Sequence, residues 1–225
     1  AVNPFKLQVT MRFSQEVQWA DEDVQIGVLQ DLASNASIAL GRALDLVVIH
    51  KINPLTGTVS SLVKEGLVDT KQSVQLAGTK YDEAIEAAAG MIISSGYVPS
   101  GIAMDPTLSF GLSTMRDADG RKIYPEIGFG QNLTNFSGMT AAVSDTVSAK
   151  NEITPDTKLL GIVGQFDAFR WGVQRSIGAH LIEYGDPDGL GDLQRQNQIA
   201  IRAEIVYGIG IMDQAAFTKI VKAEE

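Results

Sequence analysis

The sequence contains no cysteine and only two histidines, so it has little of the chemistry that most active sites need. Without cysteine there are no disulfides, no thiolate nucleophiles and no cysteine-ligated metal clusters. His50 follows a long helical pattern, where it favours the helix dipole, and His180 lies within a strand-like run, so both are interpreted as structural. No phosphate loop, nucleophile elbow or paired-histidine zinc motif occurs. We therefore predict no catalytic residue, cofactor or metal.

Positive charge is also sparse, and it is scattered. The chain has 18 Lys and Arg against 27 Asp and Glu, a formal charge of −9, and its basic residues stand singly along the sequence. A phosphate-binding surface needs clustered cations, so direct binding of nucleic acid is disfavoured. No uninterrupted apolar run reaches the length of a membrane span, and no signal peptide precedes the first strand-like run. The sequence predicts no membrane partner.

What is present is a large apolar fraction, 44% of 225 residues, which is enough for a folded core. Apolar and polar residues alternate over residues 5–17, which predicts a half-buried strand closed by Trp19. The acidic residues 21–23 then open an apolar pattern of helical spacing that continues to Asn53-Pro54, where proline stops a helix. At about 1.5 Å per residue this helix is unusually long, and we interpret it as a structural spine.

The middle of the chain alternates short elements of both kinds. Residues 56–79 are weakly patterned and are interpreted as irregular or edge structure. A helix is expected over residues 80–95 and another over 107–116, the latter opened by Asp105-Pro106. Short strands are expected at 101–104, 139–147 and 159–163, with a tight turn at 117–120. This order predicts an α+β protein rather than a parallel βαβ series.

Two long β-rich runs follow, residues 166–183 and 198–211, joined by a segment rich in Asp, Gly and Pro. They predict a long hairpin with a loop at its tip, and residues 217–221 predict a final short strand. Trp19 and Trp171 lie beside these apolar strands, and we expect them in the core or at a subunit interface.

Four segments, in this order, resemble one known family. They are Phe5-Lys6-Leu7-Gln8-Val9 through Glu16; Ala84-Ile85 through Gly101-Ile102-Ala103-Met104-Asp105-Pro106 and on to Asp119-Gly120-Arg121; Phe136-Ser137-Gly138-Met139 through Ser144; and Gly164-Gln165-Phe166-Asp167-Ala168-Phe169 with the later Ile201-Arg202-Ala203-Glu204. The chain is similar to the major capsid proteins of tailed bacteriophages, which have the Hong Kong 97-type fold. It departs from the family's pattern where an N-terminal arm and an extended loop are expected before the first strand.

The resemblance implies a fold and a domain organisation. The fold would be α+β, with a long spine helix, a long β-hairpin and a central mixed sheet flanked by helices. Residues 1–78 and 164–210 would form a peripheral domain, residues 79–163 an axial domain, and residues 211–225 would return to the axial domain. With the extended loop missing, covalent crosslinking through a lysine on that loop cannot be assigned.

The resemblance also implies a function. The chain would be a structural subunit that self-assembles into hexamers and pentamers of an icosahedral shell around double-stranded DNA, which it would hold without sequence-specific binding. Further partners would be a scaffolding protein, the portal and a protease of the phage. The location would be the virion capsid, and the bacterial cytoplasm during assembly. Two alternatives remain open: an encapsulin-like nanocompartment shell, and a cytosolic α+β enzyme with an unrecognised site.

Within this interpretation the tip of the hairpin is the best candidate for an assembly contact. Asp186, Asp188, Asp192 and Arg195 concentrate charge there. In family terms the tip would lie near threefold contacts, where these side chains could pair across subunits. The alternative is a merely solvated loop.

Overall fold

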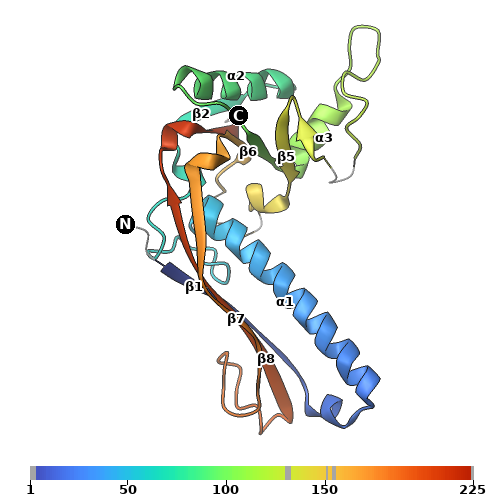
Figure 1. Cartoon of the computed structure of the whole chain (residues 1–225). Helices are drawn as coiled ribbons and strands as arrows, with labels where there is room; N and C mark the ends of the chain where they lie inside the picture. The colour runs from blue at the N-terminus through green and yellow to red at the C-terminus, as the bar shows by residue number, and fades with distance from the viewer. Residues whose placement is uncertain (1–3, 130–132, 151, 154–155, 224–225) are drawn as a thin grey trace. The chain divides into compact units, whose positions relative to one another are not determined.

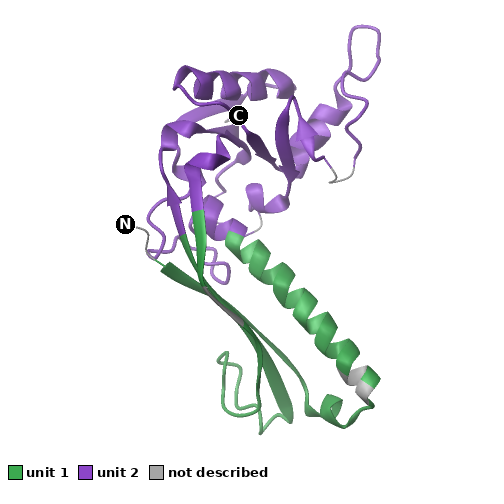
Figure 2. Cartoon of the chain, viewed as in Figure 1, with its two compact units in different colours: residues 1–44, 171–208 green, residues 45–170, 209–225 purple. Residues whose placement is uncertain are grey.

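The computed structural model describes residues 4–129, 133–150, 152–153 and 156–223. Within them the chain forms two compact units (Figure 2). Unit 1 comprises residues 1–44 and 171–208, and unit 2 comprises residues 45–170 and 209–225. The long helix α1 and the two strands of the hairpin, β7 and β8, run continuously from one unit into the other (Figure 1).

The sheet of unit 1 has three strands in the order β1-β8-β7. Antiparallel pairing of β1 with β8 places Phe5 opposite Tyr207 and Arg12 opposite Ala200. Phe5 and Leu7 are buried while Lys6 and Gln8 between them are exposed, as the alternating sequence predicts. The strands are β1 (Pro4–Ser14), β7 (Phe169–Ile182) and β8 (Gln198–Ile211).

The predicted extension of the first strand to Val17 is wrong. The strand ends at Ser14, whose hydroxyl accepts a hydrogen bond from the backbone N–H of Glu16 at 3.3 Å. This side-chain cap supports a 3-10 helix, Gln15–Trp19, in place of further strand pairing. The hairpin strand β7 likewise begins three residues later than expected, because residues 166–168 form another 3-10 turn.

The predicted long helix is confirmed as α1 (Glu22–His50), 29 residues long. It ends when Lys51 adopts the left-handed conformation at φ 57°, shortly before Pro54. By length and composition alone, residues Ile26–His50 could cross a membrane, with a mean hydropathy of 1.5. A long helix packed within a protein assembly meets the same criteria, so the absence of a membrane partner stays a prediction.

Unit 2 is built on a six-stranded mixed sheet in the order β2-β9-β6-β3-β5-β4. The pairs β2/β9 and β3/β5 are parallel, and the other neighbouring pairs are antiparallel. The strand β2 is an edge strand, as expected for its segment. The strands are β2 (Gln72–Leu76), β3 (Gly101–Met104), β4 (Asn135–Phe136), β5 (Met139–Val143), β6 (Leu159–Gly164) and β9 (Phe217–Lys222).

Two helices cover this sheet, α2 (Tyr81–Ser94) and α3 (Pro106–Thr114). α2 buries Ala84, Ile85, Ala88 and Ile92, which share one helical face. The Asp105 carboxylate caps α3 by accepting the backbone N–H of Thr107 at 2.7 Å, as the Asp-Pro signal predicts. The core between helices and sheet contains Ile102, Met104, Leu108, Leu112 and Ile220.

One predicted strand of unit 2 is shorter than expected. β5 ends at Val143 instead of Val147, because the Ser144 hydroxyl accepts the Thr146 N–H at 3.3 Å and caps a 3-10 turn over Asp145–Val147. The two-residue strand β4 was not predicted, since so short an element has no periodicity.

Candidate assembly site at the hairpin loop

The residues between β7 and β8, 183–197, form the hairpin loop, which contains all four residues predicted as an assembly contact. Backbone hydrogen bonds within the loop and to the first residue of β8 close it. The Leu193 N–H donates to the Gly185 carbonyl at 2.9 Å, and the Gln198 N–H donates to the Leu193 carbonyl at 2.9 Å. The Leu193 side chain is completely buried, so the loop has an apolar anchor of its own.

Arg12 of β1 reaches the hairpin loop and organises it. Its Nε lies 2.9 and 2.8 Å from the two Asp188 carboxylate oxygens, and its Nη2 lies 3.0 Å from Asp186 Oδ1. Nη2 also donates to the Gly191 carbonyl at 2.8 Å, and Nη1 donates to the Gln196 amide oxygen at 3.0 Å. A planar guanidinium with five N–H donors can satisfy this many acceptors at once, whereas a lysine cannot.

The same carboxylates also shape the backbone of the hairpin loop. Asp186 accepts the N–H of Gly189 at 2.8 Å and that of Gly191 at 3.1 Å. Gly191 has φ 104°, a conformation that side-chain-bearing residues rarely adopt. Asp192 accepts the Arg195 N–H at 3.0 Å and so begins the final turn. The carboxylates of Asp186, Asp188 and Asp192 therefore make hydrogen bonds within their own chain, and these bonds fix the shape of the hairpin loop.

The contact between Arg12 and Asp188 favours the charged form of both side chains. The hydrogen bond from Arg12 is the main cause that lowers the pKa of Asp188 below its ordinary value, while burial, the second cause, acts in the opposite direction. The reciprocal bond raises the pKa of Arg12. The ion pair is consequently present at neutral pH and is lost only when acid protonates Asp188.

With its acidic side chains turned to Arg12 and the backbone, the hairpin loop exposes a different set of groups. Tyr184 and Leu190 are 66% and 69% exposed, so the loop presents two large side chains with apolar surface. Arg195 is exposed, and among the described residues its guanidinium has no ion pair. A small cavity of 230 Å³ beside the loop is lined by Gln15, Gln18, Glu183, Tyr184 and Gln194.

The sequence therefore located the charged loop but missed Arg12, which lies 176 residues from Asp188 in the chain. The available signal was a lone arginine within the alternating strand 5–17, and only the strand register brings it to the acids. Trp19 and Trp171, expected in the core or at an interface, are 71% and 61% exposed, which excludes the core. An interface role for them stays a prediction.

His50 and His180 lie in different environments, one buried and the other exposed. His50 is 1% exposed, and its Nε2 lies 2.9 Å from the Val147 carbonyl oxygen and 3.2 Å from that of Thr146. Burial lowers its pKa, so the predicted interaction of a charged His50 with the helix dipole is wrong: the neutral ring is favoured. His180 is exposed on β7. Within the described ranges, no three His, Asp or Glu side chains gather as metal ligands.

Comparison with known proteins identifies the fold and the family. The sequence model of a family described as phage capsid protein matches residues 7–220. A solved structure from Mycobacterium phage Ogopogo is 47% identical, with a TM-score of 0.88 over 99% of this chain and 76% of that chain. One from Gordonia phage Cozz is 34% identical, with a TM-score of 0.84 over 100% of this chain and 71% of the other.

A more distant structure, the capsid of an empty GTA particle, shares the fold at 14% identity, with a TM-score of 0.65 over 99% of this chain and 73% of that one. No curated protein matches the chain. The predicted Hong Kong 97-type α+β fold and the predicted family are both confirmed, because the match covers nearly the whole chain. The chain belongs to the phage capsid protein family and is a structural subunit of a self-assembling capsid shell.

Proposed function

We propose that this subunit forms hexamers and pentamers that close an icosahedral shell around double-stranded DNA. The observation that supports this most strongly is the family match over residues 7–220. A shell subunit must present several modest contact surfaces to different neighbours, because many weak contacts together stabilise a closed particle. The large apolar side chains exposed on both compact units, such as Leu190 on unit 1 and Phe129 on unit 2, suit such surfaces.

Unit 1 would act as the peripheral domain and unit 2 as the axial domain. The domain boundaries expected from the family resemblance remain part of this proposal. Assembly would take place in the bacterial cytoplasm with a scaffolding protein, a portal and a phage protease as further partners. The subunit itself would catalyse no reaction. Its net charge of −9 fits a shell that encloses DNA without binding it tightly or reading its sequence.

The hairpin loop would contribute one of the contacts between subunits. Asp186, Asp188 and Asp192 would hold the loop in shape, and Arg195 with Leu190 would meet the neighbouring copy. A buried apolar centre with a charged rim is the usual composition of such a contact. Arg195→Glu should then reduce shell formation strongly, while Lys71→Glu, an equal charge change at another exposed position, should have little effect.

Negative-stain electron microscopy of the protein, expressed in bacteria from its complete reading frame, tests the proposed function. We expect closed shells or ring-shaped capsomers, and particles recovered from infected cells should contain double-stranded DNA. A monodisperse monomer at all concentrations would contradict the proposal. Shells filled with a protein cargo and free of DNA would instead favour a nanocompartment.

A further inference from the structure

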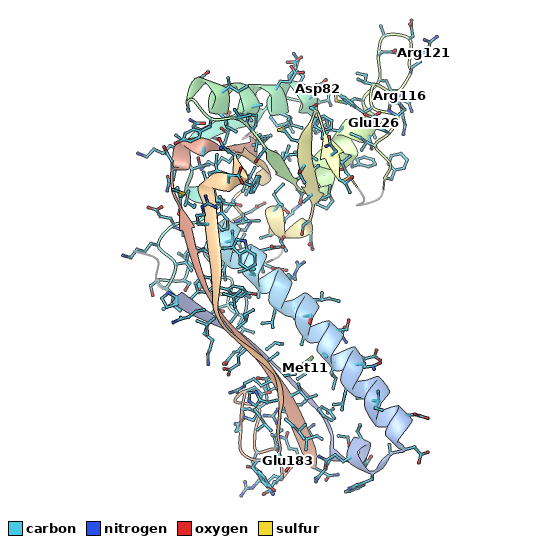
Figure 3. The ribbon with its side chains drawn as sticks, in the orientation of Figure 1. Met11, Asp82, Arg116, Arg121, Glu126 and Glu183 are labelled. Atoms are coloured by element: carbon cyan, nitrogen blue, oxygen red, sulfur yellow. The ribbon has the colours of Figure 1, made fainter. Side chains whose placement is uncertain are left out.

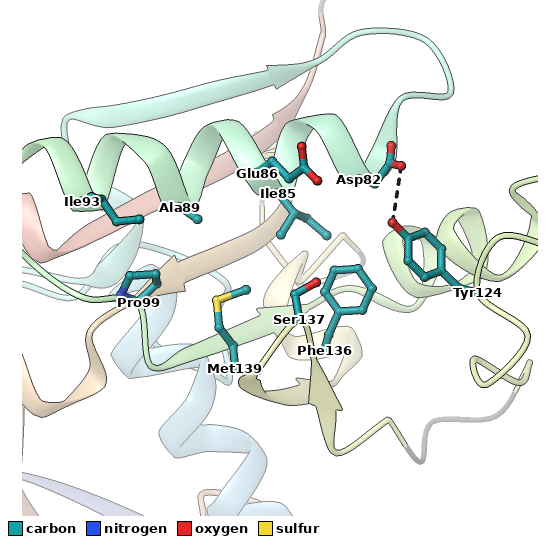
Figure 4. A pocket seen from close by; sticks show the side chains of 11 residues that line it. Asp82, Ile85, Glu86, Ala89, Ile93, Pro99, Tyr124, Phe136, Ser137 and Met139 are labelled. Carbon is teal, nitrogen blue, oxygen red and sulfur yellow. Dashed lines mark hydrogen bonds between the residues drawn. The ribbon is translucent and has the colours of Figure 1, made fainter.

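A pocket of 270 Å³ in unit 2 lies between α2 and the turn that joins β4 to β5 (Figure 4). Its two ends differ in chemistry. Asp82 and Glu86 lie at the end nearest Tyr124. Ile93 and Pro99 lie at the other end. A pocket of this volume is at the small end of the range for ligand sites, and its lining suits a ligand with one cationic end and one apolar end.

The floor of the pocket is apolar and well packed. Ile85 of α2, with Phe136 and Met139 on the two sides of the turn, lines the pocket and belongs to the buried core beneath it. The Phe136 ring packs edge-on against the Tyr124 ring, with their centres 5.4 Å apart. Ile93, by contrast, is 61% exposed. The pocket therefore continues into apolar surface that a bound apolar group would remove from water.

The other end of the pocket carries negative charge that unit 2 does not neutralise. The Tyr124 hydroxyl donates to Asp82 Oδ2 at 3.4 Å. Burial is the main cause that raises the pKa of Tyr124, and the charges of Asp82, Glu86 and Glu126 raise it further. In the part of the chain that the structure describes, none of these three carboxylates forms an ion pair.

The basic side chains nearest to these carboxylates in the sequence have other positions or partners. Lys80 Nζ, just before α2, lies 2.8 Å from Glu83 Oε2. On the loop that follows α3, Arg116 Nη1 donates to a backbone carbonyl of the same loop at 2.9 Å, and Lys122 Nζ lies 4.7 Å from the centre of an aromatic ring. Figure 3 shows Arg121 in the outer part of this loop, away from α2. A cation for the acidic end must therefore come from a ligand.

The turn between β4 and β5 offers groups that can bind a peptide backbone. Ser137 and Gly138, at the centre of the turn, have φ 49° and 80°. Serine rarely adopts this conformation, and here it places an exposed side chain beside the pocket. The short strand β4, whose Phe136 lines the pocket, is the edge strand of the six-stranded sheet. An edge strand has unpaired backbone groups, and extended peptides commonly bind to such edges.

We propose that this pocket binds a short, extended peptide segment of a partner protein, in which a lysine or arginine lies beside two apolar residues. The cation would lie between Asp82 and Glu86, and the apolar side chains against Met139 and Ile93. From Glu86 to Ile93 the helix rises about 10 Å, at about 1.5 Å per residue. Three residues of an extended peptide span this length, at about 3.3 Å each.

The apolar end distinguishes such a peptide from a free polyamine. A polyamine would carry a second charge to that end, where none of the described residues that line the pocket is acidic. It would also leave Ile93 exposed. The inference goes beyond the proposed function, because a single subunit contains the whole pocket.

Fluorescence anisotropy of labelled peptides, titrated with the full chain, tests this inference. Fluorescein-labelled Gly-Lys-Val-Leu-Gly and Gly-Leu-Val-Lys-Gly, both with amidated C-termini, present the same groups in the two chain directions. We expect one of them to bind, and norleucine in place of its lysine should weaken binding strongly. Glu86→Gln should weaken binding about five-fold, as for the loss of one exposed ion pair. Glu83→Gln removes the same charge from an exposed position outside the pocket and should leave binding unchanged.

A second pair of variants tests the apolar end of the pocket. Ile93→Ser should weaken binding several-fold, whereas Met91→Ser, at an exposed position of the same helix that does not line the pocket, should not. Circular dichroism shows that each variant is folded. If neither peptide binds at millimolar concentration, or if Glu86→Gln and Ile93→Ser bind as the wild type does, the inference is overturned.

Two other occupants would also overturn it. Displacement of the peptide by an equal concentration of spermidine would show that the pocket takes a free polyamine. Peptide binding that falls as the concentration of the chain itself rises would show that a second copy occupies the pocket. All of these outcomes leave the shell function standing, because microscopy tests it separately.

Discussion

The buried His50 predicts that acid weakens unit 2 in a definite pH range. Its Nε2 faces two carbonyl oxygens, at 2.9 and 3.2 Å, so Nε2 must carry the proton. In the neutral ring, Nδ1 then has no proton, and among the described residues it has no hydrogen-bond partner. Protonating Nδ1 would place a charge in the core without an acceptor. Burial therefore outweighs the neighbouring carbonyls and Asp156 and Glu152, and the pKa of His50 is lowered.

The direction in which pH changes the stability follows from the protonation of His50 in the folded and the unfolded chain. In the unfolded chain a histidine titrates at about 6.5. Between that value and the lower folded pKa, the unfolded chain binds more protons than the folded one. The free energy of unfolding consequently falls as the pH drops below about 6.5, by at most about 1.4 kcal/mol per pH unit for one such group. Above that pH the contribution of His50 stays constant.

Urea unfolding of the wild type and of His50→Gln between pH 5 and pH 7.5 measures the effect. The glutamine amide can still donate to the Val147 carbonyl but cannot titrate. We expect the variant to lose the His50 share of the pH slope, up to about 1.4 kcal/mol per pH unit, at the acid end of this range. If the free energy of unfolding has the same pH dependence in the wild type and in His50→Gln, the reasoning is refuted.

Three further predictions concern the packing of Gly164 and the contacts between Arg12 and the hairpin loop. A Cβ on Gly164 would lie 2.3 Å from Phe217 Cδ1, and that ring is 1% exposed and packed 5.7 Å from Phe166, so Gly164→Ala should lower the free energy of unfolding by about 1–3 kcal/mol. Gly172→Ala, with open space at its Cβ, should change it by less than about 0.5 kcal/mol in urea unfolding. Arg12→Met removes the hydrogen bonds that hold the hairpin loop, so proteolytic cleavage within the loop should become faster, while Lys6→Met on the same strand should leave it unchanged. Equal cleavage rates in the two variants would contradict the role of Arg12. Because the pKa of Asp188 is lowered, acid should loosen the wild-type hairpin loop only below about pH 4.

The sequence was informative wherever structure depends on neighbours in the chain. The alternation of Phe5 and Leu7 with polar residues and the Asp105-Pro106 cap each act within a few residues, and the strand and the helix that they begin start where they were predicted. The errors have the same local origin. Ser14 and Ser144 cap 3-10 turns with their own hydroxyls, and this side-chain competition ended strands that the apolar pattern would have continued.

The candidate site was only half predictable because it depends on register. The acids of the hairpin loop are visible in the sequence, but their partner Arg12 is brought to them by pairing of β1 with β8. Unit 2 likewise joins segments near residues 98, 167 and 213 by hydrogen bonds, and no periodicity relates these positions. His50 was located correctly at a helix end, yet its burial depends on the turn at Thr146 and Val147, so its charge state could not be predicted.

The strand order of unit 2 bears on when assembly can begin during synthesis. β9 lies between β2 and β6, and Thr218 pairs with Gln72, 146 residues earlier in the chain. The sheet therefore stays open on the ribosome until residues 217–222 have been made, and such distant pairing is slow to form. A nascent chain that still lacks β9 cannot offer a completed unit 2 to its neighbour on the same messenger RNA. Translation order alone would thus delay any contact that needs the complete sheet of unit 2 until β9 has been made.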